Sequence, residues 1–368
     1  RTKRSRLSGP VVRARSSRSS AWPERGAPAP TRGPRGPQVV RAVRGADAPH
    51  GGESLGHSVF RAARGVLKTA VMTVPRQVLA GTTCFVTRRC LERRFYLKPT
   101  PAVRQVFGYL LAVMAERHGI LLHVACVLSN HYHLVLTDPR GELPAFMQEF
   151  NATLARFLNK LWGRSENVFP GGSYQSVDLL DAETVTEHGA YALANPAVAK
   201  LLPRSKRWPG LWSAPASIGR KGTIFERPPL FFRRDGNLPA RATLTFTVPP
   251  GHEPVAFRRA LEKGIRLRER VAIAVVRQAG EKFLGLKAVM AQQPGDRATG
   301  DDKPSQSIQR VAAADGKVWH DALLRLRVFR LEYAAALGQF LSGLRTTAFP
   351  VGTYKLHAQL GFQCVPAG

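Results

Sequence analysis

Residues 120–138 read ILLHVACVLSNHYHLVLTD, and the fold that we expect depends most on this segment. It contains two apolar runs on either side of Asn130, and each run has the length of a β-strand rather than that of a helix. The stretch therefore predicts two strands, one over residues 120–129 and one over residues 132–138.

Longer segments with helical periodicity flank these strands. Residues 99–119 and 143–163 carry apolar side chains at three- and four-residue spacing, which predicts two amphipathic helices. Residues 82–89 and 174–181 suit further strands, and residues 182–202 suit a third helix that begins after Asp181 as its N-cap. The order β-α-β-β-α-β-α predicts an α+β fold, with helices packed on a largely antiparallel sheet of the ferredoxin-like or RRM-like kind.

Two histidines occur two residues apart in the second of the strands. Residues two apart in a strand point to the same face, so His131 and His133 would present two imidazoles side by side while Tyr132 points the other way. Such a pair can hold two positions of a metal ion. The same spacing also fits an ordinary, half-exposed polar face of a strand.

The third helix carries a tyrosine and an asparagine four residues apart. Tyr191 and Asn195 would lie on one helix face, where an amide oxygen could complete a hard-metal site and a phenol could attack a phosphate. The alternative is that Tyr191 is a core residue and that Asn195 ends the helix, because Pro196 disfavours helical geometry in the residue before it.

Composition and charge restrict the class of protein. The 368 residues are 44% hydrophobic, which is typical of a folded chain, and a formal charge of +30 favours a polyanionic partner, either nucleic acid or an anionic membrane surface. We find no apolar run near the ~20 residues that span a bilayer, and no secretory signal, so we expect an intracellular protein. We expect Cys84, Cys90, Cys126 and Cys364 to be free thiols, because their spacing suits neither zinc ribbons nor a disulfide framework.

The two ends of the chain differ from its centre. Residues 1–71 are rich in Arg, Pro, Gly, Ala and Ser, which predicts a disordered basic tail, and Met72 is a candidate natural start. Residues 217–368 predict a mainly helical accessory region, with a strand in 237–250, helices over 253–280 and 318–344, and a polar linker at 292–307. Asp301 and Asp302 in this linker are expected to be solvated.

Several further residues are candidates for contact with nucleic acid. Basic and aromatic side chains gather after the first strand, after the third helix and at the Gly-rich entry to the fourth strand: Arg88, Arg89, Arg93, Arg94, Lys206, Arg207, Trp208 and Tyr174. The alternative for the basic groups is a solvated surface. His123 and His188 are expected to be structural or surface residues, although His188 lies one turn before Tyr191 and is a candidate for proton transfer.

Four blocks in this order, SNHYHLVLTD, GGSYQSVDLLD, YALANPAVAKLL and RWPGLWS, resemble the single-tyrosine HUH transposases of insertion sequences, especially the REP-associated tyrosine transposases. The resemblance covers about residues 76–216. It implies an HUH motif of His131, Tyr132 and His133, and a nucleophile at Tyr191 ahead of the pair Asn195 and Pro196.

The resemblance implies a metal-dependent single-stranded DNA endonuclease and strand transferase that acts in DNA transposition. Mg²⁺ or Mn²⁺ would be held by His131, His133 and Asn195, and Tyr191 would form a 5′-phosphotyrosine intermediate. The DNA would form a hairpin, the protein would be cytoplasmic and nucleoid-associated in a prokaryote, and a homodimer is left open because the family includes both dimers and monomers.

Two alternatives of other kinds remain. One is a catalytically silent protein of the same fold that binds DNA or RNA. The other is a replication-initiator or relaxase-like HUH enzyme, which the order of the motifs disfavours because the tyrosine follows the histidines.

Overall fold

The computed structural model describes residues 75–172, 174–229, 231–232, 236–298 and 310–366. The predicted tail of residues 1–71, the candidate start at Met72, and Asp301 and Asp302 lie outside the described residues. All four cysteines are described and none is paired with another, so the prediction of free thiols is confirmed.

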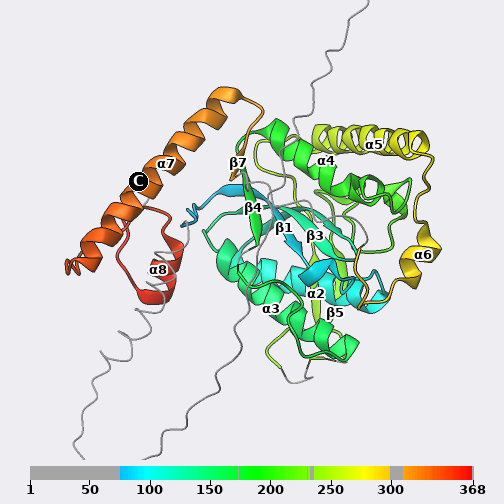
Figure 1. Cartoon of the computed structure of the whole chain (residues 1–368), viewed down its shortest axis with the longest axis horizontal. Coiled ribbons are helices and arrows are strands. Elements are labelled where there is room, and N and C mark those ends of the chain that lie inside the picture. The colour runs from blue at the N-terminus through cyan, green and yellow to red at the C-terminus, as the bar shows by residue number, and fades with distance from the viewer. Residues whose placement is uncertain (1–74, 173, 230, 233–235, 299–309, 367–368) are drawn as a thin grey trace, which may run out of the picture. The chain divides into compact units, whose positions relative to one another are not determined.

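The centre of the fold is a mixed five-stranded sheet (Figure 1). Its strands lie in the order β2, β3, β1, β4, β7, where β1 is Thr82–Arg89, β2 is Leu121–Val127, β3 is His131–Asp138, β4 is Gln175–Leu179 and β7 is Val311–Ala312. The pairs among the first four strands are antiparallel, and β7 pairs with β4 in parallel. The predicted α+β class is confirmed. The bounds of β1, β2, β3 and β4 differ from the predicted bounds by at most about two residues.

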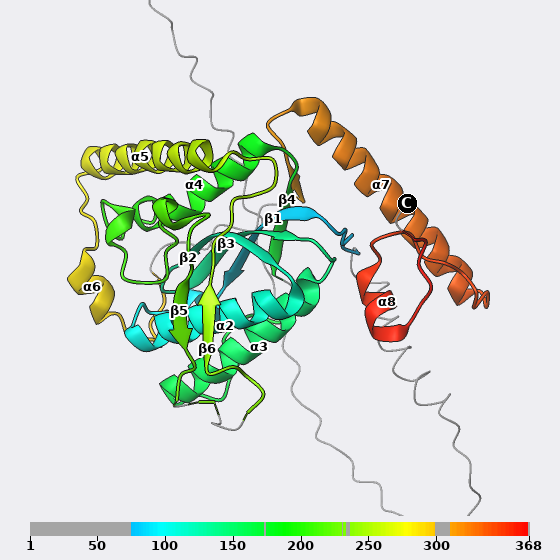
Figure 2. The ribbon, with the colours of Figure 1, turned by 180° about the vertical axis from the view of Figure 1, so that it is seen from behind.

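Helices cover both faces of the sheet. Side chains alternate along β3, so successive residues of this strand meet different helices. Tyr132 contacts Phe107 of α2 (Pro101–His118) and Phe150 of α3 (Leu143–Trp162), whereas His133 points to the opposite layer and reaches Asn195 of α4 (Ala182–Val198). Figure 2 shows α2 and α3 on one side of the strands and α4 on the other. The alternation thus directs Tyr132 to the layer of α2 and α3 and the two histidines to the layer of α4.

The first helices begin and end at local signals in the sequence. The side chain of Thr100 accepts a hydrogen bond from the Val103 backbone N–H and caps α2, which ends at Gly119 with a φ of 67°. Helix α3 ends in the same way at Gly163, with a φ of 62°. Both helices therefore match the ranges that periodicity predicts.

Helix α4 begins as predicted, at Asp181, whose carboxylate accepts a hydrogen bond from the Thr184 backbone N–H. It passes through Pro196, so Asn195 lies inside the helix and does not end it. The helix stops at Val198 rather than at residue 202, because Lys200 adopts a φ of 56° and Leu202 turns into a buried cluster with Trp208. The predicted end of this helix is corrected by four residues.

Residues 208–213 run along the outer edge of β2. The Val127 backbone N–H donates to the Leu211 carbonyl, and the Ser213 backbone N–H donates to the Ala125 carbonyl. The indole N–H of Trp208 donates to the Val127 carbonyl at 2.7 Å, and that of Trp212 donates to the Leu193 carbonyl of α4 at 2.9 Å. This segment joins α4 to the sheet.

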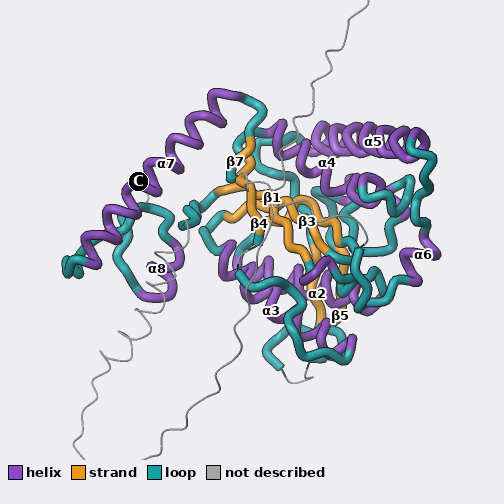
Figure 3. Tube along the Cα trace, viewed as in Figure 1, coloured by secondary structure: helices purple, strands orange, loops and turns teal. Residues whose placement is uncertain are grey.

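The C-terminal region contains helices α5 (Pro254–Gln278), α6 (Leu286–Ala291), α7 (Gly316–Leu341) and α8 (Tyr354–Leu360). It also contains a hairpin of β5 (Thr223–Glu226) and β6 (Arg241–Leu244), as well as β7, which joins the main sheet (Figure 3). The strand predicted over 237–250 is confined to β6, since Pro239, Pro249 and Pro250 lack the N–H that a ladder requires. A separate accessory domain from residue 217 onward stays a prediction.

Helix α5 packs on α4, and its predicted range is nearly as observed. Of the helices in the described residues, none is both long and apolar enough to cross a bilayer.

Candidate active site

The two predicted histidines lie side by side on the face of β3 that meets α4. The ring centroids of His131 and His133 are 4.8 Å apart. His133 is buried, and His131 is partly exposed at the start of the strand. The spacing of two residues has therefore produced the adjacent imidazoles that strand geometry predicts.

Each imidazole is oriented through its Nδ1 atom. His133 Nδ1 lies 2.9 Å from the hydroxyl oxygen of Thr87, its cross-strand neighbour in β1. His131 Nδ1 lies 2.6 Å from the side-chain oxygen of Asn130. Because an amide oxygen only accepts, His131 carries its proton on Nδ1 and keeps the lone pair on Nε2.

His133 also carries its proton on Nδ1, as its contact with Asn195 shows. The Asn195 side-chain nitrogen lies 3.2 Å from His133 Nε2 and, as an N–H donor, requires the lone pair to be on that atom. His133 Nδ1 then donates to Thr87. Both histidines consequently present Nε2 lone pairs, the arrangement in which neutral imidazoles bind metals and second-layer groups fix their orientation.

Both histidines are held in the neutral form. Burial and, next, the nearby charge of Arg89 lower the pKa of His131 to about 4. Burial, followed by the charges of His131 and Arg89, lowers the pKa of His133 well below its ordinary value. Arg89 acts in this way because it is the cross-strand partner of His131. At neutral pH the pair is thus ready to donate lone pairs.

The fit of a divalent cation depends on Asn195. The described residues contain no group of three His, Cys, Asp or Glu side chains that could hold a metal, so the third protein ligand here would be an amide oxygen. Asn195 is buried beside the histidine pair, and its amide nitrogen hydrogen-bonds His133. Rotation of its amide group would present Oδ1 instead of the nitrogen, and two imidazoles with an amide oxygen would then form a mixed nitrogen and oxygen donor set for a divalent cation.

Tyr191 lies at the open edge of this site. Its ring is 38% exposed, and its centroid is 5.7 Å from that of His133 and 6.0 Å from that of Phe85. Within the described part of the chain its hydroxyl has no hydrogen-bond partner. The phenol is therefore accessible to a ligand and is not a core residue.

Phe85 is a member of the site that sequence analysis missed. It stacks on His133 at 5.2 Å with an interplanar angle of 13°, and it also contacts the rings of His188 and Tyr191. The alternation of side chains along β1 indicates that Phe85 and Thr87 share one face of the strand. The sequence does not give the register between β1 and β3, so it did not show that this face meets His133.

The two other histidines have packing partners. His188 Nδ1 donates to the Thr184 carbonyl at 2.9 Å, and its ring contacts Phe85 rather than the Tyr191 hydroxyl. His123 is buried between the Thr247 carbonyl and the Thr137 hydroxyl, at 3.0 and 2.8 Å, and burial lowers its pKa to about 4. His123 is structural, as expected, and proton transfer by His188 stays a prediction.

The four arginines after the first strand differ in their surroundings. Arg88 donates to the Pro170 carbonyl at 2.7 Å, and Arg94 forms an ion pair with Glu92 at 2.6 Å. Arg93 is partly buried, whereas Arg89 is exposed beside His131. Arg89 is therefore the member of the group best placed to meet a phosphate at the site.

The remaining candidates are divided between surface and core. Lys206 and Arg207 are exposed after α4, but Trp208 is buried and its N–H is already bonded to β2, so its surroundings suit packing rather than stacking on a base. Tyr174 is half-buried beneath the Arg76 guanidinium, 4.3 Å from the ring centroid, and burial raises the pKa of its hydroxyl to about 12.

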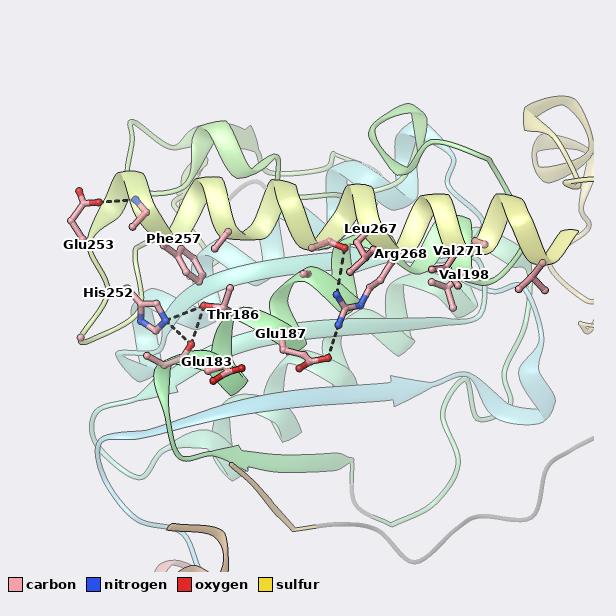
Figure 4. Close-up of a pocket in the computed structure, with 18 of the residues that line it drawn as sticks. Glu183, Thr186, Glu187, Val198, His252, Glu253, Phe257, Leu267, Arg268 and Val271 are labelled. Carbon is pink, nitrogen blue, oxygen red and sulfur yellow. Dashed lines mark hydrogen bonds and ion pairs between the residues drawn. The ribbon is translucent and has the colours of Figure 1, made fainter. Parts of the chain in front are cut away.

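A groove of about 1050 Å³ lies elsewhere, between α4 and α5 (Figure 4). Its described lining includes Thr186, His252, Leu267 and Val271, and it includes neither the histidine pair nor Tyr191. The predicted residues therefore form a site of their own at the layer between β3 and α4.

The sequence matches no family model and no curated protein. Among solved structures, the chain is similar to a REP-associated tyrosine transposase bound to a REP hairpin, with a TM-score of 0.32 and 16% sequence identity. The similarity covers 37% of this chain and 78% of that one. At these values the likeness is distant.

Proposed function

We propose that the protein is a transposase-like, metal-dependent enzyme that cuts and rejoins single-stranded DNA through Tyr191. The observation that supports this proposal is the convergence of three groups beside an exposed phenol. The Nε2 lone pairs of His131 and His133 and the amide of Asn195 lie on one face, and the Tyr191 ring contacts His133 at the open side.

A divalent cation, Mg²⁺ or Mn²⁺, would be held by His131, His133 and Asn195. When bound, it would supply positive charge that polarises a phosphate and offsets the charge of the transition state. Thr87 and Asn130 would orient the two imidazoles, and Phe85 would hold His133 and Tyr191 at a constant separation.

Tyr191 would be the nucleophile. Its phenolic oxygen would form a bond to phosphorus as the bond from phosphorus to the 3′-oxygen breaks, with the phenolic proton lost and a proton gained by the departing 3′-oxygen. The products are a 5′-phosphotyrosine and a free 3′-hydroxyl. Attack by a 3′-hydroxyl on the phosphotyrosine reverses the step and joins strands without an external energy source.

The strand order β2-β3-β1-β4 with antiparallel pairs, and two helices on one face, support the ferredoxin-like arrangement expected from the sequence. Hairpin DNA as the substrate, self-association and nucleoid association remain predictions from the sequence.

One observation favours a catalytically silent nucleic-acid-binding protein as a second candidate. The Asn195 amide nitrogen already satisfies the His133 lone pair, so the three side chains form a stable set without a metal. In that case the basic surface would bind DNA or RNA and Tyr191 would only stack on a base.

The experiment is to incubate the full-length chain with labelled single-stranded hairpin DNA and Mn²⁺ or Mg²⁺, and to look for a covalent adduct after denaturation. We expect an adduct for the wild type and for Tyr354→Phe, a matched control in which a partly buried tyrosine of α8, outside the site, is changed. We expect none for Tyr191→Phe or His131→Ala. Metal-independent binding without an adduct would support the silent candidate instead.

A further inference from the structure

Helix α5 has one face that is committed to the fold. Phe257, Leu261 and Ile265 are buried against α4, and a Cβ on Gly264 would lie 2.7 Å from the Cβ of Ala190. The two helices are therefore in close contact, and the opposite face of α5 points away from α4.

One stripe along the exposed side of α5 is cationic. At ~100° per residue, five side chains fall within an arc of about 60° that lies opposite the buried residues, and every position of the helix within this arc is Lys or Arg. All five are exposed, and we call them the α5 basic face: Arg259, Lys263, Arg266, Arg270 and Arg277. They extend over about 27 Å of helix axis.

The charges of this face are little compensated within the protein. Arg266 has an ion-pair partner, Glu262 at 3.4 Å, and the other four have none among the described residues. Arg268, by contrast, turns to the α4 side and pairs with Glu187 at 2.7 Å (Figure 4). Like charges three and four residues apart destabilise a helix, so this row is unfavourable for folding unless an anion meets it.

We propose that the α5 basic face binds the sugar–phosphate backbone of nucleic acid. A 27 Å row of cations matches about 8 base pairs of duplex at 3.4 Å per pair, such as the stem of a hairpin. The arc contains only Lys and Arg, the side chains that neutralise phosphates, and no Asn, Gln or aromatic side chain for contacts with adenine or for stacking on a base. This α5 contact would be a second DNA contact outside the active site. The choice of DNA as the ligand rests on the proposed function.

An anionic membrane fits this face less well. A membrane-surface helix places apolar side chains beside its cations for insertion. Of the large exposed apolar residues of α5, Leu267, Val271 and Val275 instead line the groove toward α4, and Val255 lies in the first turn of the helix, ahead of the basic face. The arc that points outward therefore lacks an apolar anchor.

The test compares two full-length variants that each lose four positive charges. The α5 variant carries R259Q, K263Q, R270Q and R277Q. The control carries K317Q, R325Q, R327Q and K355Q, all at exposed positions of α7 and α8. Gln preserves helix propensity, and far-ultraviolet circular dichroism checks that both variants are folded.

The measurement is the affinity for a labelled DNA hairpin, by fluorescence anisotropy, from 50 to 300 mM salt. Each lost phosphate contact lowers the slope of log affinity against log salt by about 0.7–0.9. We expect a decrease of about 3 for the α5 variant and less than about 1 for the control. A double variant, R270Q with R277Q, should show about half the decrease, and it serves if the fourfold change impairs folding.

Equal decreases in the two variants would overturn the proposal, because they would reflect net charge alone. An unchanged slope in the α5 variant would also overturn it. So would loss of binding to phosphatidylserine vesicles with DNA binding intact, which would assign the face to a membrane. The covalent adduct is a separate readout: if the slope falls as expected but Tyr191 forms no adduct, the proposed enzyme fails while the α5 contact stands.

Discussion

Replacing Thr87 with valine should weaken metal binding more than it weakens the fold. Valine has nearly the shape of threonine but cannot accept the hydrogen bond from His133 Nδ1, which is 2.9 Å long. His133 is only 4% exposed, so its Nδ1–H would lose its acceptor. An unsatisfied buried donor costs about 1–3 kcal/mol, and we expect the lower end because Thr87 is itself partly exposed.

The larger effect concerns the metal. Without Thr87, the His133 ring can rotate or exchange tautomers, and removal of such an orienting partner lowers metal affinity by about 10- to 100-fold. The assay is titration of the full-length protein with Mn²⁺, with free Mn²⁺ followed by electron paramagnetic resonance, and urea unfolding in parallel.

Thr83→Val is the matched control for this prediction. Thr83 lies on the same face of β1, and its hydroxyl bonds to Thr137 at 2.7 Å rather than to either histidine of the pair. It should lose a similar amount of stability and keep its Mn²⁺ affinity. Equal Mn²⁺ affinities for Thr87→Val and the wild type would refute the role that we assign to Thr87.

Three further predictions concern packing and pH. Gly264→Ala should destabilise the protein by about 1–3 kcal/mol in urea unfolding, because its Cβ would lie 2.7 Å from that of Ala190. Gly338→Ala, in α7 with nothing within 4 Å, should be neutral or stabilising by up to about 1 kcal/mol, and equal effects at the two glycines would contradict the close helix contact. The pKa of His123 is lowered from 6.5 to about 4, so the unfolded chain binds more protons between these values and stability should fall as pH drops through this window. The loss attributable to His123 is at most about 3 kcal/mol, and urea unfolding of His123→Gln at pH 7 and 4.5 should show a correspondingly smaller pH dependence. Trp208→Phe should cost about 1–3 kcal/mol through the lost bond to a β2 carbonyl, with DNA affinity unchanged, whereas a stable variant with weakened DNA binding would favour base stacking.

Much of the fold could be predicted because its signals are local. Helices α2 and α3 have apolar spacing, a capping residue or proline at the start and a glycine at the end, all within about 20 residues. The strands β1 and β3 have apolar runs of adequate length. The strands β5 and β7 were missed because they have four and two residues, and each exists through pairing with a partner distant in the chain or across a loop.

The end of α4 shows where local rules fail. The residue before a proline is disfavoured in a helix, yet Asn195 is helical and α4 continues to Val198. At this end of the helix the Leu193 carbonyl accepts from the Trp212 indole N–H, and the Pro196 carbonyl accepts from the Leu201 backbone N–H. These donors arrive from beyond the helix. Trp208 is buried because residues 208–213 pack along β2. This packing is not visible in the local sequence, which suggested that Trp208 contacts nucleic acid at the surface.

That His131 and His133 share a face and that Tyr191 and Asn195 share one helix could be read from the amino-acid sequence, because these relations follow from the periods of one strand and one helix. The meeting of these two faces, and the contacts of Thr87 and Phe85 with His133, become visible in the folded chain alone. The reason is physical: the register between β1 and β3 and the packing of α4 on the sheet depend on contacts summed over the whole core, which no single segment specifies.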